Sequence, residues 1–206
     1  MYRTNTCGEL RAENTGTKVL LAGCVHHTRE HGGVRFIDLR DRYGKTQIVF
    51  RPDVKEAFEA SHDLSREDVI QIEGTCVLRP EEMRKDDYPT GHIEVIAEKL
   101  TILSEAEPPV FPIEDEINVR EETRLKYRYL DLRRKVIQEG LLKRHEAIQA
   151  TREYLTDKGF IEIETPILMK STPEGARDYL VPSRVNKGKF YALPQSPQTY
   201  KQLLMI

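Results

Sequence analysis

Five short stretches between positions 19 and 102 have the pattern of β-strands, the first compact and apolar and others alternating, and they limit the first half of the chain to a small β structure. The stretches cover residues 19–25, 34–40, 45–50, 69–78 and 93–102, with a short helical insert at 54–60. In the last stretch Ile93 and Val95 alternate in one phase and Leu100 and Ile102 in the other, which predicts a β-bulge. Five strands with a helix between the third and the fourth predict an OB-fold barrel, and a small β-sandwich is the alternative.

A proline-rich and acidic segment follows the last predicted strand. Residues 104–118 contain Pro108, Pro109 and Pro112 among several carboxylates. Such a composition is typical of a semi-rigid spacer between domains. We therefore predict two domains, residues 1–104 and 120–206, joined by a hinge at 105–119.

The second half has the pattern of an α+β domain. Residues 121–134 have a charged, helical composition, and 136–156 predict an amphipathic helix that Gly159 ends. Residues 160–165 then predict a short strand that stops at Pro166, because proline has no N–H for a ladder. A last helix is predicted at 198–205. It runs into four apolar residues at the end of the sequence, so we expect the chain to be cut short, since domain ends are usually polar.

Charge is distributed unevenly in the first half. The whole chain has a net charge of −2, which alone favours neither nucleic acid nor its absence, but residues 27–51 carry six basic and three acidic side chains. Phe36 shares its strand face with Asp38 and faces away from the core. An outward aromatic ring beside Arg29 and Gln47 is typical of a platform for single-stranded nucleic acid. The alternative is a second small core that buries Phe36.

Other chemistry is not expected from the cysteines and histidines. Cys7, Cys24 and Cys76 are far apart and form no C-x-x-C pair, so neither a zinc site nor a disulfide is expected. The histidines around position 27 have no acidic or thiol partner at metal-ligand spacing. The sequence shows no signal peptide and no apolar run of membrane-spanning length, so we expect a cytoplasmic protein without a membrane partner.

A second set of polar side chains lies near the end of the chain. The loop at 172–178 brings Glu174 together with Arg177 and Asp178, and Gln198 and Lys201 share one face of the last helix. Carboxylate, amide and ammonium groups in this arrangement suit a small zwitterion with a second negative group. The alternative is a solvated surface loop and an exposed helix lysine.

Several strings in the sequence resemble one known family over nearly the whole chain. They are FIDLRD at 36–41, RLKYRYLDLR at 124–133, GFIEIETP at 159–166, TPEGARDYLVPS at 172–183 and LPQSPQTYKQ at 193–202. Together they resemble the N-terminal part of the bacterial-type aspartyl-tRNA synthetases, which are class II aminoacyl-tRNA synthetases. The second and third strings are shared with the lysyl and asparaginyl relatives, whereas the last two are more specific to aspartate.

The resemblance implies a fold and a reaction. It implies an OB-fold anticodon-binding domain at 1–104, a hinge, and the truncated start of a catalytic domain with an antiparallel sheet at 120–206. The segment from Gly159 to Pro166 resembles motif 1, which implies a homodimer interface. The implied reaction activates L-aspartate with ATP and Mg²⁺ and transfers it to the 3′ end of tRNA(Asp), with the metal ligands expected outside this sequence.

The resemblance also implies roles for individual residues. Glu174 would hold the α-ammonium of aspartate, Ser196 and Gln198 its backbone groups, and Lys201 its side-chain carboxylate. In the OB domain, Phe36 would stack on an anticodon base, and the residues that read base edges would be Arg29, Gln47 and Glu94. His31 at its loop position is typical of non-discriminating enzymes that also charge tRNA(Asn), and Met83 on a nearby loop would contribute.

Two departures from the family pattern change what we expect. Cys24, His26 and Thr28 stand in the first strand where many relatives have an aromatic residue and arginines, so a weaker grip on phosphate is expected. Motifs 2 and 3, which carry the ATP-binding arginines, are missing, so we expect these 206 residues alone to form no adenylate. The alternatives are a stand-alone OB-fold binder of single-stranded nucleic acid or tRNA, a lysyl or asparaginyl enzyme, and a non-catalytic paralogue that binds or modifies tRNA. Lys201 argues against lysine as the substrate, because two ammonium groups would face each other.

Overall fold

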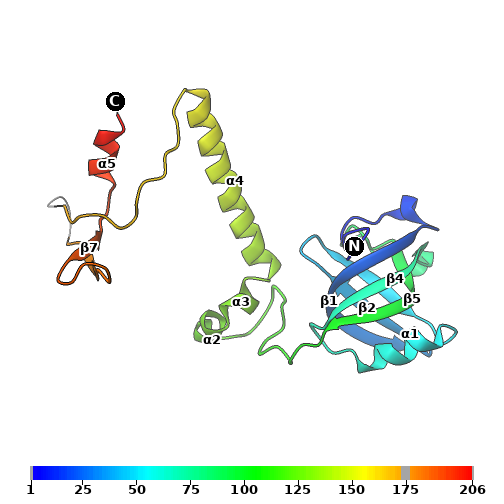
Figure 1. Cartoon of the computed structure of the whole chain (residues 1–206). Coiled ribbons are helices and arrows are strands. Elements are labelled where there is room, and N and C mark those ends of the chain that lie inside the picture. The colour runs from blue at the N-terminus through cyan, green and yellow to red at the C-terminus, as the bar shows by residue number, and fades with distance from the viewer. Residues whose placement is uncertain (1, 173–176, 206) are drawn as a thin grey trace. The chain divides into compact units, whose positions relative to one another are not determined.

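The computed structural model of the chain describes residues 2–172 and 177–205 (Figure 1). Its strands are β1 (Lys18–His31), β2 (Val34–Arg40), β3 (Lys45–Phe50), β4 (Val69–Leu78), β5 (Ile93–Ser104), β6 (Tyr179–Pro182) and β7 (Phe190–Leu193). Its α-helices are α1 (Lys55–Ala60), α2 (Glu121–Lys126), α3 (Arg128–Asp131), α4 (Lys135–Asp157) and α5 (Gln198–Leu203). Three 3-10 turns, η1 (Ala12–Asn14), η2 (Ser61–Asp63) and η3 (Glu81–Met83), complete the list of regular elements described.

Five strands form a closed barrel in the order β1-β2-β3-β5-β4. Neighbouring strands are antiparallel except β3 and β5, which pair in parallel through Ile48 opposite Val95 and Val49 opposite Ile96. Helix α1 lies between β3 and β4 in the sequence. The OB-fold prediction, with its helical insert, is therefore confirmed. The first strand was predicted too short, because β1 continues to His31 as the partner of β2.

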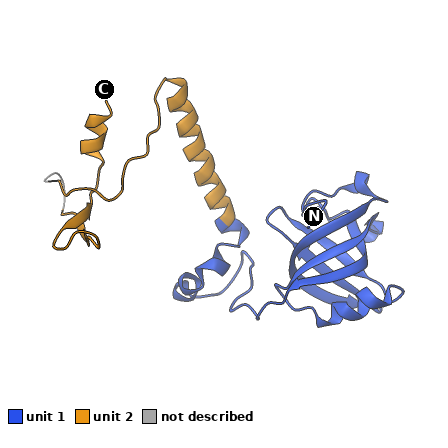
Figure 2. Cartoon of the chain, viewed as in Figure 1, with its two compact units in different colours: residues 1–137 blue, residues 138–206 orange. Residues whose placement is uncertain are grey.

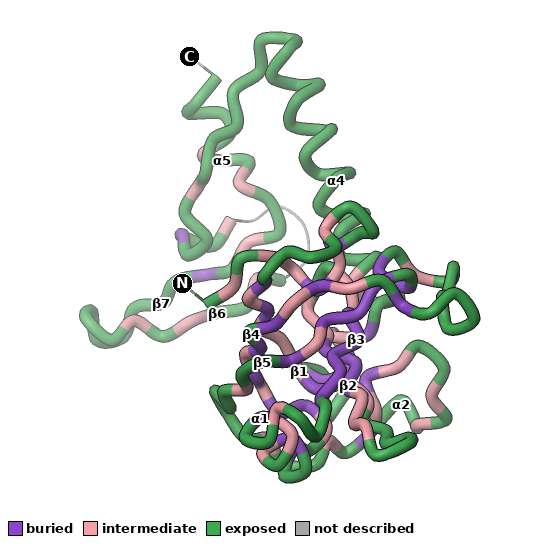
Figure 3. Tube along the Cα trace, turned by 90° about the vertical axis from the view of Figure 1, so that its right-hand side faces the viewer, coloured by how far each residue is buried: buried purple, intermediate pink, exposed green. Residues whose placement is uncertain are grey.

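The inward side chains of the barrel make the main apolar core. Figure 3 shows the buried positions concentrated in the barrel strands. Ile37, Ile48, Ile72 and Val95 are fully buried, as strand alternation requires for one face of each strand. Each such side chain contributes about 1.5–3 kcal/mol relative to an exposed one, so this core holds the outer face in a fixed geometry.

The predicted bulge in the last barrel strand is present. Opposite β4, Gly74 pairs with Ala97 and Glu73 with Lys99, which leaves Glu98 as the extra residue. At this point the two backbones approach closely: a Cβ added to Gly74 would lie 2.2 Å from the carbonyl oxygen of Ile96. Glycine is therefore needed here because there is no room for a side chain, not because of an unusual φ.

A second, smaller core forms in the segment after the barrel. Phe111, Ile113 and Leu130 are buried together, and Tyr127 packs against them. The helix predicted at 121–134 is wrong in detail, because it is broken into α2 and α3 at Tyr127, whose backbone is not helical (φ −106, ψ 46). Packing of the Tyr127 side chain into this core overrides the helical propensity of the segment.

The chain divides into two compact units, residues 1–137 and 138–206 (Figure 2). The division falls within α4, so the hinge predicted at 105–119 lies inside the first unit. Helix α4 ends as predicted at Gly159, whose φ is 84. The N–H of Gly159 donates to the oxygen of Thr156 (2.9 Å) and the N–H of Phe160 to that of Leu155 (3.0 Å), which is a Schellman motif.

The strand predicted at 160–165 is absent from the described structure. These residues have no strand pairing, and the side chain of Ile161 is 83% exposed. A β-strand needs a neighbour for its N–H and C=O groups, and no described strand pairs with this segment. The described sheet of the second unit is instead the two-stranded pair β6–β7.

Candidate nucleic-acid interface and amino-acid site

Strand register brings the predicted base-reading residues together on the outer face of the barrel. Arg29 on β1 lies opposite Phe36 on β2, and Asp38 on β2 lies opposite Gln47 on β3. Side chains in directly opposed positions are about 4.5–5.5 Å apart at Cβ, so they are within contact distance. The outer face of β1, β2 and β3 thus presents an aromatic ring beside cationic, amide and acidic groups.

Three of the predicted residues form one hydrogen-bonded line. Nη2 of Arg29 donates to Oε1 of Gln47 at 2.6 Å, and Nε2 of Gln47 donates to Oε2 of Glu94 at 2.8 Å. Arginine has only donors and a carboxylate only acceptors, so the amide of Gln47 has one satisfactory orientation between them. Gln47 and Glu94 are buried, whereas the side chain of Arg29 is 46% exposed. The line is therefore rigid at one end and accessible at the other.

Asp38 is a fourth member of this group, to which the sequence analysis gave no role. Its Oδ1 accepts a hydrogen bond from Nη2 of Arg29 at 3.3 Å, and the residue is 8% exposed. The sequence did contain a signal, because alternation along the strand puts Asp38 on the same face as Phe36.

The remaining nucleic-acid residues lie at the surface of the same domain. Phe36 is partly exposed and belongs to neither described apolar cluster, so a small core that buries it is not seen among the described residues. His31 is exposed at the end of β1, and Met83 is 58% exposed in η3, between β4 and β5.

A charged bridge connects the barrel with the segment after it, within the first unit. Arg40 forms two hydrogen bonds with the carboxylate of Glu67, both 2.9 Å, and Nη2 of Arg133 lies 2.9 Å from the same carboxylate. Nη1 of Arg40 also donates to the carbonyl oxygen of Ile113 at 3.3 Å. Sequence reasoning missed this bridge, because no local spacing relates its members.

The bridge affects a neighbouring histidine. The pKa of His26 is lowered to about 3, first by burial and then by the nearby charges of Arg40, His27, Arg66 and Lys45. Its Nδ1 lies 3.4 Å from Nη1 of Arg40. His26 is therefore neutral at physiological pH, and a neutral ring nitrogen is what an arginine can use as an acceptor.

A buried carboxylate organises the short helices after the hinge. Asp131 is fully buried and forms ion pairs with Arg124, Arg128 and Arg134. Burial alone raises the pKa of Asp131, but the hydrogen bond from Arg134 and the charges of the three arginines hold it below its usual range. The carboxylate is therefore ionised and joins α2, α3 and Arg134, the residue before α4.

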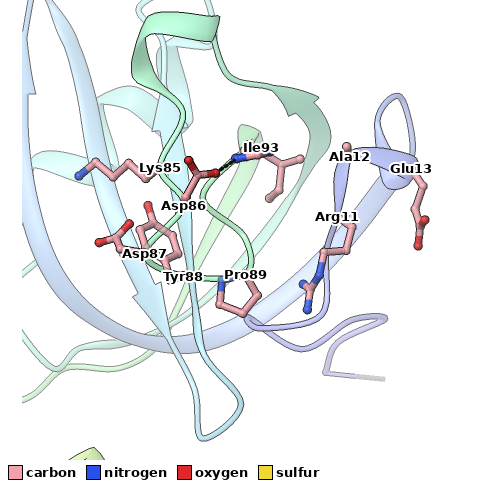
Figure 4. A pocket seen from close by; sticks show the side chains of 10 residues that line it. Arg11, Ala12, Glu13, Lys85, Asp86, Asp87, Tyr88, Pro89 and Ile93 are labelled. Carbon is pink, nitrogen blue, oxygen red and sulfur yellow. Dashed lines mark hydrogen bonds and ion pairs between the residues drawn. The ribbon is translucent and has the colours of Figure 1, made fainter.

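A pocket of about 610 Å³ is lined by none of the residues of the base-reading line (Figure 4). It is formed by the segment that contains Arg11 and Glu13 and by the loop between β4 and β5, including Lys85, Asp87 and Tyr88. Its charged side chains are of both signs, and none of the residues predicted to bind RNA or aspartate lines it. It therefore plays no part in the site described above.

The second unit carries the residues predicted to bind the amino acid. Ser196 is exposed just before α5, and Gln198 and Lys201 lie three residues apart in that helix, both exposed. Glu174 lies outside the described residues, so its predicted approach to Lys201 stays a prediction. The ends of its loop are tied by Asp178, whose Oδ2 accepts from Oγ of Ser171 at 2.9 Å and from the N–H of Thr172 at 3.3 Å.

Two further findings concern metals and membranes. In residues 2–172 and 177–205 there is no group of three or more His, Cys, Asp or Glu side chains that could hold a metal ion. Among the helices in that part of the chain, none combines the length and the apolar character needed to cross a membrane.

Comparison with known families covers most of the chain in two parts. Residues 19–103 match the family described as OB-fold nucleic acid binding domain. Residues 120–206 match the family described as tRNA synthetases class II (D, K and N). Residues 104–119, nearly all of which lie between the barrel and α2, separate the two matches.

Individual relatives match over the whole chain. An aspartate–tRNA(Asp/Asn) ligase of Desulfosudis oleivorans is 56% identical and an aspartate–tRNA ligase of Thermosipho africanus 58% identical; each match covers 100% of this chain and 35% of the relative. Among solved structures, asparaginyl-tRNA synthetase from Pyrococcus horikoshii complexed with asparaginyl-adenylate is similar with a TM-score of 0.81 and 29% identity, over 98% of this chain and 45% of that one. The chain thus joins an OB-fold nucleic acid binding domain to a segment of the tRNA synthetases class II (D, K and N) family, is similar over its whole length to aspartate–tRNA ligases, and spans about a third of the length of the curated relatives it matches.

Proposed function

We propose that the chain is the anticodon-reading domain and the beginning of the catalytic domain of an aspartate–tRNA ligase. In the proposed reaction, an oxygen of the α-carboxylate of L-aspartate attacks the α-phosphorus of ATP and pyrophosphate leaves. The aspartyl group then passes to a hydroxyl at the 3′ end of tRNA(Asp), and AMP leaves. Catalysis of this kind depends mainly on positioning and charge stabilisation.

One observation carries the RNA part of the proposal: the hydrogen-bonded line from Arg29 through Gln47 to Glu94, next to the partly exposed ring of Phe36. A base that stacks on Phe36 lies beside Arg29, because the two residues are directly opposed in the sheet. Fixed donors and acceptors beside a stacking surface are what sequence-specific binding of single-stranded RNA requires.

The amino-acid part of the proposal rests on α5 and the loop before it. We assign the side-chain carboxylate of aspartate to Lys201, its backbone groups to Ser196 and Gln198, and its α-ammonium to Glu174. Gln198 and Lys201 support this assignment because they share one face of α5 and are exposed. Preference for aspartate over asparagine follows, since a neutral amide would leave the ammonium of Lys201 without its counter-charge.

The remaining partners are proposed at a coarser level. ATP is a substrate, and Mg²⁺ would supply charge stabilisation on its phosphates; no step is assigned to it here because the described residues offer no metal cluster. A homodimer through the segment from Gly159 to Pro166 is supported by the exposure of Ile161 and Ile163 between them. A cytoplasmic location follows from the reaction.

Selectivity for the third anticodon base is proposed to depend on His31 and Met83. Both side chains are exposed on the domain that carries the base-reading line. With His31 in place we propose that the chain accepts the anticodons of both tRNA(Asp) and tRNA(Asn). Replacing His31 by leucine should lower the affinity for the tRNA(Asn) anticodon relative to that for tRNA(Asp).

The experiment uses the 206-residue chain and RNA hairpins that carry the anticodon loops. Fluorescence anisotropy should show binding to the tRNA(Asp) hairpin and an approximately tenfold weaker affinity when the middle anticodon base is changed. Equal affinity for every anticodon would overturn the proposal. The variant Phe36→Ala should weaken binding by about tenfold or more, since base–aromatic stacking contributes about 1–3 kcal/mol per base.

A second function, RNA binding without catalysis, is favoured by the same barrel, because its base-reading line is complete without any residue of the second unit. The two functions differ in the second unit, because a pure RNA binder needs no aspartate site. ATP–pyrophosphate exchange does not separate them at the level of this chain, because we expect no exchange by these residues alone under either function. Isothermal titration calorimetry with L-aspartate should detect weak binding that Lys201→Ala abolishes. A heat of aspartate binding that is the same with and without this substitution would favour the pure RNA binder.

A further inference from the structure

The charge of Arg29 is already compensated in the absence of RNA. Both of its described contacts use Nη2, which donates to Oδ1 of Asp38 at 3.3 Å and to Oε1 of Gln47 at 2.6 Å. Asp38 is the partner that carries the opposite charge, and its side chain is only 11% exposed. An ion pair with one partner largely shielded from water is screened much less by salt than a fully exposed pair.

Two carboxylates lie on this face, Asp38 on β2 and Glu94 on β5. Carboxylates repel the phosphates of an RNA strand, so the surface between them is unfavourable for the backbone. The edge of a base carries no charge and can approach them. The acidic pair therefore selects which part of a nucleotide can lie against Arg29.

We propose that Asp38 is a specificity-determining residue, which holds and neutralises Arg29 so that its guanidinium reads a base edge rather than a phosphate. This inference rests on the proposed function and deepens it. The Nη1 and Nε groups of Arg29 remain available for carbonyl oxygens on a base. Oε2 of Glu94 accepts from Gln47 and Oε1 has no described donor, so Oε1 can accept an N–H of a base that enters this face. The chemistry selects a base whose edge has a carbonyl oxygen next to an N–H.

Salt dependence distinguishes this role from a merely structural one. An arginine that contacts phosphate releases counterions, and each such contact on a single strand changes the slope of log K against log[salt] by about 0.7. An arginine neutralised by Asp38 contributes little to that slope. Freed from Asp38, Arg29 should behave as a phosphate-binding cation.

The test compares Asp38→Asn with the unchanged chain, using anisotropy with the anticodon hairpins at several salt concentrations. We expect Asp38→Asn to steepen the salt slope by about 0.7, to bind mismatched hairpins more tightly, and to lose about tenfold of its discrimination between bases. The matched control is Asp53→Asn, which removes one exposed carboxylate from the same domain and should leave slope and discrimination unchanged. Unchanged slope and discrimination in Asp38→Asn would overturn the inference.

A second variant keeps the test decisive if Asp38→Asn folds poorly. Arg29→Gln should lower base discrimination but leave the salt slope unchanged, because the charge that it removes is already compensated. A slope reduced by about 0.7 in Arg29→Gln would show a phosphate contact and contradict the inference. If the unchanged chain shows no preference between bases, the proposed function is wrong. If the unchanged chain does prefer one base, but Asp38→Asn and Arg29→Gln do not change discrimination and salt slope as stated, only the role of Asp38 is wrong.

Discussion

Glu67 accepts two hydrogen bonds from Arg40 while its own backbone has a φ of 73, in the left-handed region that non-glycine residues rarely adopt. Its N–H donates to the oxygen of Val25 at 2.7 Å, and its carboxylate also meets Arg133. A glycine would adopt this backbone conformation without strain. In other residues the strain of this conformation costs about 1–3 kcal/mol. The side chain is therefore present for the bridge that it makes between the barrel and the segment before α4.

We predict that Glu67→Gln destabilises the chain by about 2 kcal/mol, because it leaves two arginines without their shared carboxylate. Glu67→Gly should lower the free energy of unfolding by less than loss of the carboxylate alone would, since glycine relieves backbone strain of about 1 kcal/mol or more. Urea unfolding measures the free energy of unfolding of both variants. The control is Glu81→Gln at an exposed position, which should change the free energy of unfolding by less than about 0.5 kcal/mol. Equal stability of Glu67→Gln and Glu81→Gln would show that the bridge is not stabilising.

His26 predicts a loss of stability on the acidic side of neutrality. Its pKa is about 3 in the folded chain, below the value of about 6.5 expected when unfolded, so the unfolded chain binds more protons between these values. The free energy of unfolding therefore falls as the pH falls from about 6.5 towards 3. His26→Gln should flatten this dependence between about pH 6.5 and 4.5, above the range in which most carboxylates titrate.

Thermal unfolding at several pH values checks the role of His26. The exposed His145→Gln is the matched control and should keep the pH dependence of the unchanged chain. An identical change of Tm with pH in His26→Gln and the unchanged chain would mean that His26 is not held neutral by the fold.

Two glycines should respond in opposite ways to alanine. At Gly74 a new Cβ would lie 2.2 Å from the oxygen of Ile96, so Gly74→Ala must separate β4 from β5 and should cost about 1–3 kcal/mol or prevent folding. At Gly140, inside α4, nothing lies within 4 Å, and Gly140→Ala should stabilise the helix by about 0.5–1 kcal/mol. Circular dichroism during heating compares them. A harmless Gly74→Ala would contradict the close approach at the bulge.

Features with a short sequence period were predictable in this chain. The outward position of Phe36 and the bulge near Glu98 both follow from alternation along a single strand, and both are found. The pairing of Arg29 with Gln47 was partly predictable, because both were expected on the same face. The donor and acceptor roles within that line were not, since they depend on register across three strands.

Features that depend on a distant partner could not be predicted. Arg40, Glu67 and Arg133 have no periodic relation, and only the fold brings them together. The strand at 160–165 had the right composition but lacks a described neighbour to pair with, which composition cannot reveal. The break at Tyr127 has the same cause, because the ring joins a core contributed by residues before the helix.

The apolar stripe of α4 gives the last prediction. Leu141, Ile148 and Leu155 recur every seven residues on one side of the helix and are 51%, 40% and 42% exposed. Such a stripe is unfavourable in water, so we expect it to be covered by a second copy of the chain, as the proposed homodimer requires. Sedimentation equilibrium should show self-association that Ile148→Glu weakens by about tenfold or more, because a charge would then enter an apolar contact. Glu146→Gln, on the opposite side of α4, is the control and should associate like the unchanged chain. A monomer at all concentrations would contradict the homodimer, and equal association of the two variants would show that α4 lies outside its interface.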